Sequence, residues 1–150
     1  MKKINWGIIG LGNIAEKFAE GFNFSENANL LSVSSLNEKK IKKFKKKFSL
    51  SKEYCFNNYE DLINCNDIDI IYIALPNSMH FKWVLKCLEN KKNVLVEKPA
   101  VMNSFEIEEI KKILKKQSIF FSEAFMYRFL PHFNKLIELI KKNYIGELSS

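Results

Sequence analysis

Short apolar segments alternate with amphipathic segments along this 150-residue chain, and no other feature limits its possible folds as strongly. The segment Asp69–Leu75 is apolar after its first residue, without polar alternation, which is typical of a strand buried on both faces of a parallel sheet. Between such segments, apolar residues recur every three or four positions, which indicates helices. Strands are therefore predicted over residues 4–9, 30–34, 54–56, 69–75, 93–96 and 119–122.

Helices are predicted between and after these strands. The first begins at Asn13 and the last near Pro131, because proline suits a first helical turn. Asn103 and Glu106 have the spacing of a capping box, which predicts a helix start between them. Such units join by right-handed crossovers into an α/β fold, here a doubly wound parallel sheet of the Rossmann type. The predicted inward faces of the helix after residue 80 and of the last helix are Phe81, Val84, Leu85 and Leu88, and Phe133, Leu136, Ile137 and Ile140.

The charge pattern argues against a nucleic-acid partner. The net charge of +7 comes from 24 basic and 17 acidic residues, and every basic residue except Arg128 is a lysine. Proteins that read nucleic acids rely on the forked donors of arginine, which this chain almost lacks. The seven lysines of residues 39–47 are interpreted as a solvated helix face. A nucleic-acid function would require steeply salt-dependent binding, which we do not expect.

Cysteine content and hydropathy exclude further classes. The three cysteines, Cys55, Cys65 and Cys87, form no close pair, so we predict neither a disulfide framework nor a metal site. The longest uninterrupted apolar run, Ile70–Leu75, has six residues, and a membrane-spanning helix needs about 20. We expect no membrane partner and a location in the reducing cytoplasm.

The first predicted strand leads into a glycine-rich turn, Gly10-Leu11-Gly12-Asn13-Ile14-Ala15, that opens the first helix. In this G-x-G-x-x-A pattern Gly10 permits a tight turn, Gly12 lets the backbone approach a pyrophosphate, and Ala15 allows close packing of helix on strand. The helix N-terminus, from Asn13 and Ile14 onward, offers amide donors to the anion. The pattern predicts a dinucleotide site; the alternative is a turn needed only for packing.

The end of the second strand bears on the choice of cofactor. A site for NAD normally has an acidic residue there, which binds the ribose hydroxyls. This chain has Ser34 and Ser35 instead, and Glu38 already opens the next helix. Ser35 with Lys39 or Lys40 can bind a 2′-phosphate, so NADP is preferred and NAD is the alternative. Equally, the serines can simply end a strand.

The loop after the fourth strand, Leu75-Pro76-Asn77-Ser78-Met79-His80, is predicted to line the cofactor cleft. In an open parallel sheet, ligands bind beyond the carboxyl ends of the strands. Asn77 can alternatively cap the following helix. His80 is a candidate proton donor, with the alternative that it is a packed or capping residue.

The fifth strand ends in Glu97-Lys98-Pro99, a charged pair at the end of a buried segment. Lys98 is the predicted catalytic residue, because its ammonium can bond the reacting hydroxyl and stabilise a developing alkoxide. Glu97 and Lys98 are both predicted to lie beside the cofactor. The alternative is an exposed ion pair.

Beyond the sixth strand, Arg128 is a candidate to hold a cofactor amide or phosphate, or a substrate oxygen. Glu123 and Tyr127 can add hydrogen bonds. The aromatic residues around them can equally form a core that joins two domains, and the sequence does not separate these readings.

Four segments together, GLGNIA, ALPNSMH, VLVEKP and EAFMYRFLP, resemble the glucose-fructose oxidoreductase, inositol dehydrogenase and MocA family of NAD(P)-dependent oxidoreductases. The resemblance implies a Rossmann domain followed by a C-terminal α/β domain that holds a sugar, a polyol or a related cyclic alcohol and often mediates homo-oligomers. It implies that Lys98 is the catalytic or substrate-orienting lysine, and that Pro76, Asn77 and His80 lie on the nicotinamide side. Relatives commonly carry arginine after the serine, where this chain has Leu36. The last segment is most similar to the branch with dihydrodiol and xylose dehydrogenases.

The resemblance also implies how the chain divides. Residues 1–122 are predicted to form the dinucleotide-binding Rossmann domain. Residues 123–150 are predicted to be a connecting segment, a helix and the first residues of an incomplete substrate domain, with Gly146 stopping the helix before a new strand. We expect an oxidoreductase, or its N-terminal piece, that moves hydride between nicotinamide and an alcohol carbon; these 150 residues alone are expected to bind cofactor without efficient turnover. The alternative is a non-catalytic dinucleotide-binding module.

Overall fold

The computed structural model describes residues 3–146 and contains one six-stranded sheet with the order β3-β2-β1-β4-β5-β6. All of its strand pairs are parallel. This doubly wound order confirms the predicted fold class. The chain reverses its direction across the sheet between β1 and β4, which places the topological switch point there. The strands are β1 (Ile4–Ile9), β2 (Ala28–Ser34), β3 (Cys55–Phe56), β4 (Ile70–Ile73), β5 (Asn93–Val96) and β6 (Phe121–Glu123).

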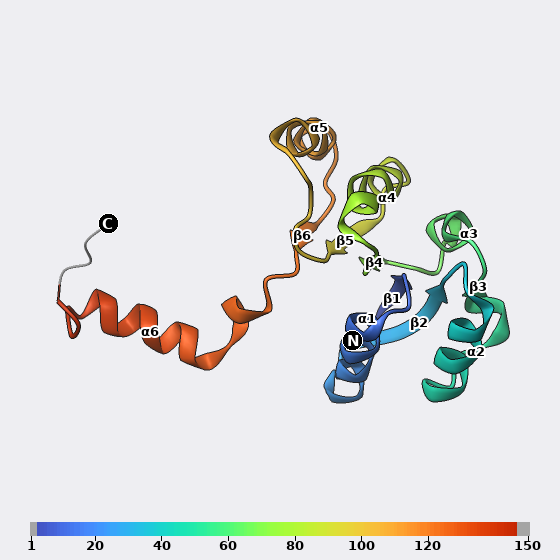
Figure 1. Cartoon of the computed structure of the whole chain (residues 1–150), viewed down its shortest axis with the longest axis horizontal. Helices are drawn as coiled ribbons and strands as arrows, with labels where there is room; N and C mark the ends of the chain where they lie inside the picture. The colour runs from blue at the N-terminus through green and yellow to red at the C-terminus, as the bar shows by residue number, and fades with distance from the viewer. Residues whose placement is uncertain (1–2, 147–150) are drawn as a thin grey trace.

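Helices cover the sheet on both sides (Figure 1). The helices α1 and α2 lie on one side, and α3, α4 and α5 lie on the other. This follows from right-handed crossovers, because the chain first steps one way from β1 and later steps the opposite way from β4. The bounds are α1 (Asn13–Glu20), α2 (Glu38–Lys47), α3 (Tyr59–Asn64), α4 (Asn77–Glu89), α5 (Ser104–Leu114) and α6 (Pro131–Lys141).

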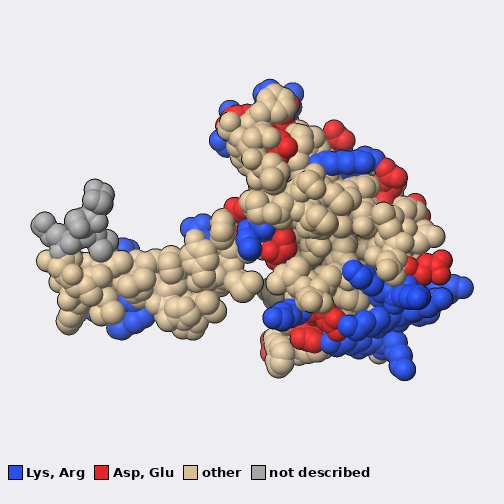
Figure 2. Space-filling model, viewed as in Figure 1, with Lys and Arg blue, Asp and Glu red and all other residues tan. Residues whose placement is uncertain are grey.

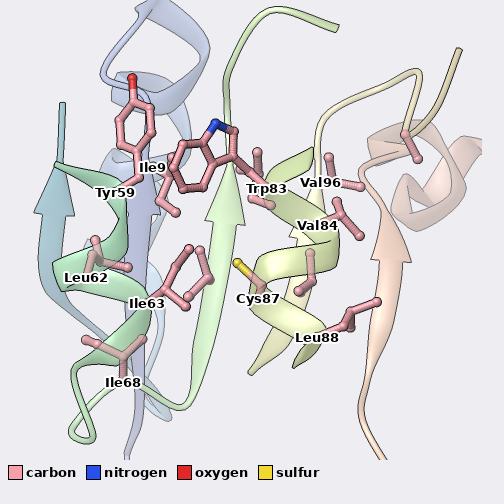
Figure 3. Packing of buried hydrophobic residues seen from close by; sticks show 14 of the residues in the cluster. Ile9, Tyr59, Leu62, Ile63, Ile68, Trp83, Val84, Cys87, Leu88 and Val96 are labelled. Atoms are coloured by element: carbon pink, nitrogen blue, oxygen red, sulfur yellow. The ribbon is translucent and has the colours of Figure 1, made fainter. Parts of the chain in front are cut away.

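Two apolar clusters hold the layers together, one on each side of the sheet. The larger cluster joins α3, α4 and α5 to the central strands, and its members interdigitate in Figure 3. Within it Tyr59 meets Trp83 edge to face, with ring centroids 4.9 Å apart. On the other side, Phe18 of α1 stacks on Tyr72 of β4 at a centroid distance of 4.0 Å. The four buried residues of β4 confirm that this strand is covered on both faces.

The inward face of α4 differs from the prediction. Val84 and Leu88 are buried as predicted, whereas Phe81 and Leu85 are only partly buried. The buried face of α4 is rotated from the predicted one, because His80, Trp83 and Cys87 are buried beside Val84 and Leu88 at helical spacing. The full buried set is His80, Trp83, Val84, Cys87 and Leu88.

The lysine-rich patch lies on α2 and forms the large blue area in Figure 2. Two of its members are paired with α1: Lys43 Nζ lies 2.7 Å from Glu16, and Lys47 Nζ lies 2.8 Å from Glu16 and 2.5 Å from Glu20. The apolar side of the same helix buries Ile41 and Phe44 against the sheet.

The last helix behaves differently from the other five. In Figure 1, α6 runs away from the body of the domain. It begins with Pro131 in its first turn, as predicted, but none of its residues is buried, and Leu136 is 47% exposed. The predicted helix stop at Gly146 is wrong: α6 ends at Lys141 with Lys142 as its C-cap, and Asn143, at a φ of +58°, supplies the left-handed residue directly after the cap. The strand predicted to open after Gly146 lies outside the described residues.

Candidate active site

The turn after β1 requires glycine at position 10. Gly10 has a φ of +88°, and a Cβ atom there would lie 2.6 Å from the carbonyl oxygen of Ala74. Its amide donates to the carbonyl oxygen of Ser34 at 3.0 Å. Gly10 therefore packs the ends of β1, β2 and β4 together at the switch point, which leaves no space for any other side chain.

The start of α1 is open. Gly12 occupies the N-cap position with no side-chain hydrogen bond to the helix, and a Cβ atom built on it would meet nothing within 4 Å. Three other helices begin under an asparagine cap, supplied by Asn37, Asn58 and Asn103. The first-turn amides of α1, from Asn13 through Ala15, thus keep free donors beside empty space. These residues fit a pyrophosphate, since backbone donors and the positive end of the helix dipole both favour an anion.

Ser35 lies next to this turn, immediately after β2. It is 6% exposed, and its hydroxyl accepts from the Asn37 amide at 3.1 Å, which leaves the hydroxyl hydrogen available to a ligand. Asn37 in turn accepts from the amides of Lys39 and Lys40. Both lysines begin α2 and are exposed. Hydroxyl and ammonium donors at this place can bond either a ribose hydroxyl or a phosphate.

The loop after β4 reaches the same edge of the sheet. The helix α4 starts at Asn77, with Pro76 as the N-cap residue and no side-chain capping bond. Asn77 therefore does not cap the helix, contrary to one alternative, and its side chain is exposed. Leu75 approaches the glycine turn, because a Cβ atom on Gly10 would lie 2.8 Å from Leu75 Cδ2.

His80 is fully buried, with 0% exposure. Its Nδ1 lies 2.8 Å from the carbonyl oxygen of Pro99, and its Nε2 lies 2.7 Å from the carbonyl oxygen of Leu75. The ring thus sits behind the two loops and contacts their backbone. This placement favours the packing interpretation of His80 over that of a proton donor to a ligand in the cleft.

Glu97 and Lys98 follow β5 and do not pair with each other. The Lys98 side chain is exposed, and the ion pairs of residues 3–146 include none between it and Glu97. Instead Glu97 accepts from the Tyr72 hydroxyl at 2.5 Å and from the Lys98 backbone amide at 3.3 Å. The Lys98 ammonium is left to meet other partners, which is what a reactive lysine requires.

Tyr72 is a site residue that the sequence interpretation missed. Burial and, second, the hydrogen bond to Glu97 raise the pKa of the Tyr72 hydroxyl well above its usual value, so it stays protonated and donates. The sequence signal that could have identified it is the Tyr72 hydroxyl, the single polar side-chain group in the apolar strand β4. Such a group needs a partner, and here the partner is 25 residues away in sequence.

Glu123 ends β6, and its carboxylate accepts from the Ala100 amide at 2.8 Å. Arg128 lies in the short 3₁₀ helix η3 (Met126–Phe129) and is exposed. A hollow of about 720 Å³ opens between α1 and β6 on the α1 side of the sheet. Its walls are mainly apolar and include Glu97 and Glu123, but not Arg128. The structure thus brings the predicted residues after β1, β2, β4 and β5 to one edge, while Arg128 is not among the residues that line the hollow.

Other site types find little support in residues 3–146. Within that range no group of three or more His, Cys, Asp or Glu side chains could hold a metal ion. Burial raises the pKa of the Cys87 thiol to about 12, so it is a poor nucleophile. No helix in the described part of the chain has the length and apolarity to cross a membrane.

The sheet order, the glycine turn at the switch point and the open start of α1 define a Rossmann domain of the dinucleotide-binding class. Residues 4–125 match the oxidoreductase family with an NAD-binding Rossmann fold, and the chain belongs to this glucose-fructose oxidoreductase, inositol dehydrogenase and MocA family. The resemblance noted from the four sequence segments is thereby confirmed.

Individual relatives agree with this assignment. The chain is 36% identical over 149 residues to oxidoreductase P35 of Formosa agariphila, covering 99% of this chain and 46% of the relative. It is 33% identical over 145 residues to trans-1,2-dihydrobenzene-1,2-diol dehydrogenase of Xenopus laevis, covering 95% and 43%. The solved structure of scyllo-inositol dehydrogenase from Lactobacillus casei, with bound NAD(H) and scyllo-inositol, has a TM-score of 0.88 at 25% identity, covering 97% and 43%. The chain spans less than half of the length of each of these proteins.

Proposed function

We propose that this chain is the cofactor-binding half of an NAD(P)-dependent oxidoreductase that moves hydride between nicotinamide and a sugar, a polyol or a related cyclic alcohol. The observation that carries the proposal is the meeting of the open glycine turn and the loop of Lys98 at the carboxyl edge of one sheet. A dinucleotide held at the switch point extends along this edge, past the ends of β4 and β5.

Each group of residues has a defined task. The amides from Gly12 through Ala15 bind the pyrophosphate, and the loop Leu75-Pro76-Asn77 forms the wall on the nicotinamide side. When bound, the cofactor supplies the hydride acceptor or donor. Lys98 donates a hydrogen bond to the reacting oxygen and stabilises negative charge there as the alcohol loses its proton and hydride. The proton itself passes to a base that we place, by resemblance to the family, in the second domain.

NADP is the preferred cofactor of this proposal, with NAD as the alternative. Ser35 retains a donor, Lys39 and Lys40 are exposed at the start of α2, and no carboxylate ends β2 to repel a phosphate. Leu36 stands where relatives commonly carry arginine, so only serine and lysine hold the phosphate. Arg128 is proposed to hold a cofactor amide or phosphate, or a substrate oxygen.

The domain division is also part of the proposal. Residues 1–122 form the Rossmann domain, and residues 123–150 begin a second, substrate-binding domain. The unburied stripe of α6 and the apolar hollow beside β6 are the surfaces that this second domain would cover. We further propose a homo-oligomer for the full-length form.

The test of the proposed function is a pair of measurements on Lys98→Ala in the full-length protein. Fluorescence titration with NADPH and NADH should give nearly unchanged affinity, because Lys98 contacts the reacting oxygen and not the pyrophosphate. Turnover of a polyol or dihydrodiol substrate should fall by about 10²-fold or more. Lys91→Ala, an exposed lysine just before β5, is the matched control. Unchanged turnover would remove Lys98 from the mechanism, and absent binding of both cofactors would remove the dinucleotide site.

The second candidate is a non-catalytic dinucleotide-binding module. It is favoured by one observation: the candidate proton donor His80 is fully buried, with both ring nitrogens at hydrogen-bond distance from backbone carbonyl oxygens. The two candidates separate on turnover, since both predict cofactor binding and only the first predicts oxidation of an alcohol.

A further inference from the structure

The buried ring of His80 makes two contacts that packing alone does not require. Both ring nitrogens lie at hydrogen-bond distance from backbone carbonyl oxygens, 2.8 Å to Pro99 and 2.7 Å to Leu75. An apolar side chain of similar size would fill the same volume between α4 and the sheet. The use of a polar residue at 0% exposure therefore needs a reason in what it bonds.

The two carbonyl groups belong to the two loops that matter most to the site. Leu75 follows β4 and borders the glycine turn, whereas Pro99 directly follows Lys98 in the chain. His80 comes from the first turn of α4, which is anchored in the core through Val84 and Leu88. The ring thus lies between the two loops: a neutral imidazole has one N–H and donates to one of these carbonyl oxygens, whereas only the protonated ring donates to both.

A second side chain, from the end of β6, holds the same segment. Glu123 at the end of β6 accepts from the amide of Ala100 at 2.8 Å, one residue beyond the carbonyl group that His80 contacts. Before Lys98, the Glu97 carboxylate accepts from the Lys98 amide. The backbone is fixed on both sides of Lys98, while the Lys98 side chain itself is exposed.

We propose that His80 and Glu123 are positioning residues that fix the backbone of residues 98–100 and so set the direction in which Lys98 points. The inference rests on the proposed role of Lys98 for its functional meaning, but the fixation itself is a property of this chain alone. Lysine has a long side chain with many rotamers, so a mobile backbone beneath it would spread the ammonium over a wide region. Catalysis needs that group placed to within a fraction of an ångström.

Amide hydrogen exchange, measured by NMR on the 150-residue chain without cofactor or substrate, tests the inference. The variants His80→Leu and Glu123→Ala remove one anchor each. Because each variant removes a hydrogen bond and leaves a buried group unpaired, exchange at Lys98 and Ala100 should rise about tenfold or more. His80→Gln, whose amide can still donate, should restore part of the protection.

Val84→Ala is the matched control, because it truncates a buried residue one turn further along α4 without touching either loop. It lowers stability through a cavity and should raise exchange across the whole domain with no preference for residues 98–100. If His80→Leu and Glu123→Ala raise exchange at these amides no more than Val84→Ala does at equal loss of stability, the inference is wrong. If His80→Leu does not fold, His80→Gln and Glu123→Ala decide in the same way.

Titration of the same proteins with NADPH and NADH separates this inference from the proposed function. Suppose exchange at residues 98–100 rises in the variants although the chain binds neither cofactor. That result would support the positioning role of His80 and Glu123 and would contradict the proposed cofactor-binding function. If the chain binds a cofactor but exchange at residues 98–100 is unchanged in the variants, the proposed function is supported and the positioning role of His80 and Glu123 is wrong.

Discussion

Two helices of this chain have the same length and the same kind of sequence pattern, but only one of them buries its apolar stripe. Both α5 and α6 have 11 residues and an apolar stripe at helical spacing. In α5 the stripe lies on the sheet and Ile110 has 0% exposure, whereas in α6 Leu136 is 47% exposed and no residue is buried. An amphipathic pattern therefore specifies that a helix needs a partner surface, and the rest of the fold decides whether that surface is present.

The difference between α5 and α6 is tested most directly by truncating one apolar residue in each helix and comparing the loss of stability. Ile110→Ala leaves a cavity in the larger cluster and should lower the free energy of unfolding by about 2–5 kcal/mol. Leu136→Ala removes an exposed side chain and should change it by less than about 0.5 kcal/mol. Urea denaturation followed by circular dichroism measures both. A large loss in Leu136→Ala would mean that α6 packs on the domain after all.

A smaller effect is expected where the domain borders the open hollow. The raised pKa of Tyr72 means that folding favours its protonated, donating form. This contribution is fully present below pH 10, the ordinary value for tyrosine, and is lost as the pH rises above it. Thermal melts between pH 8 and pH 11 should show the loss in the wild-type chain and a smaller loss in Tyr72→Phe. Identical pH profiles would show that folding does not raise the pKa of the Tyr72 hydroxyl.

The smallest effect concerns the surface that joins α1 to α2. Bonds from Lys43 and, second, Lys47 lower the pKa of Glu16, so these ion pairs stabilise the fold above the ordinary glutamate value and are lost as the pH falls. Solvent and salt screen such exposed pairs. Glu16→Gln should lower the melting temperature less than Tyr72→Phe does, and only at low salt. A drop that persists in 1 M salt would contradict this account.

The sequence predicted the parts of the fold that depend on local pattern. The strands β1 and β5 were predicted with their observed bounds, Ile4–Ile9 and Asn93–Val96. The crossover rule then predicted a parallel sheet with helices on both faces, whereas the strand order and the switch point at Gly10 come from the structure. The sequence also singled out Lys98 and Ser35, although their roles stay predictions.

The parts that it did not predict depend on contacts between distant residues. His80 bonds Pro99 across 19 residues, and Tyr72 bonds Glu97 across 25. Nothing in the spacing of either pair indicates a partner, because the pairing is set by how α4 and β5 pack against β4. The inward face of α4 was mispredicted for the same reason, since His80 and Cys87 were not counted among its buried residues.

The uncapped start of α1 has a consequence for which substitutions evolution can accept in such a domain. A serine, aspartate or asparagine cap stabilises a helix by roughly 1 kcal/mol, and α2, α3 and α5 each have one. At position 12 a smaller gain, about a few tenths of a kcal/mol because glycine is itself a tolerated cap, is open to a single substitution, since nothing crowds that side of Gly12. A better-capped helix would satisfy with its own side chain the donors that a ligand needs, so selection for stability and selection for binding oppose each other at this residue.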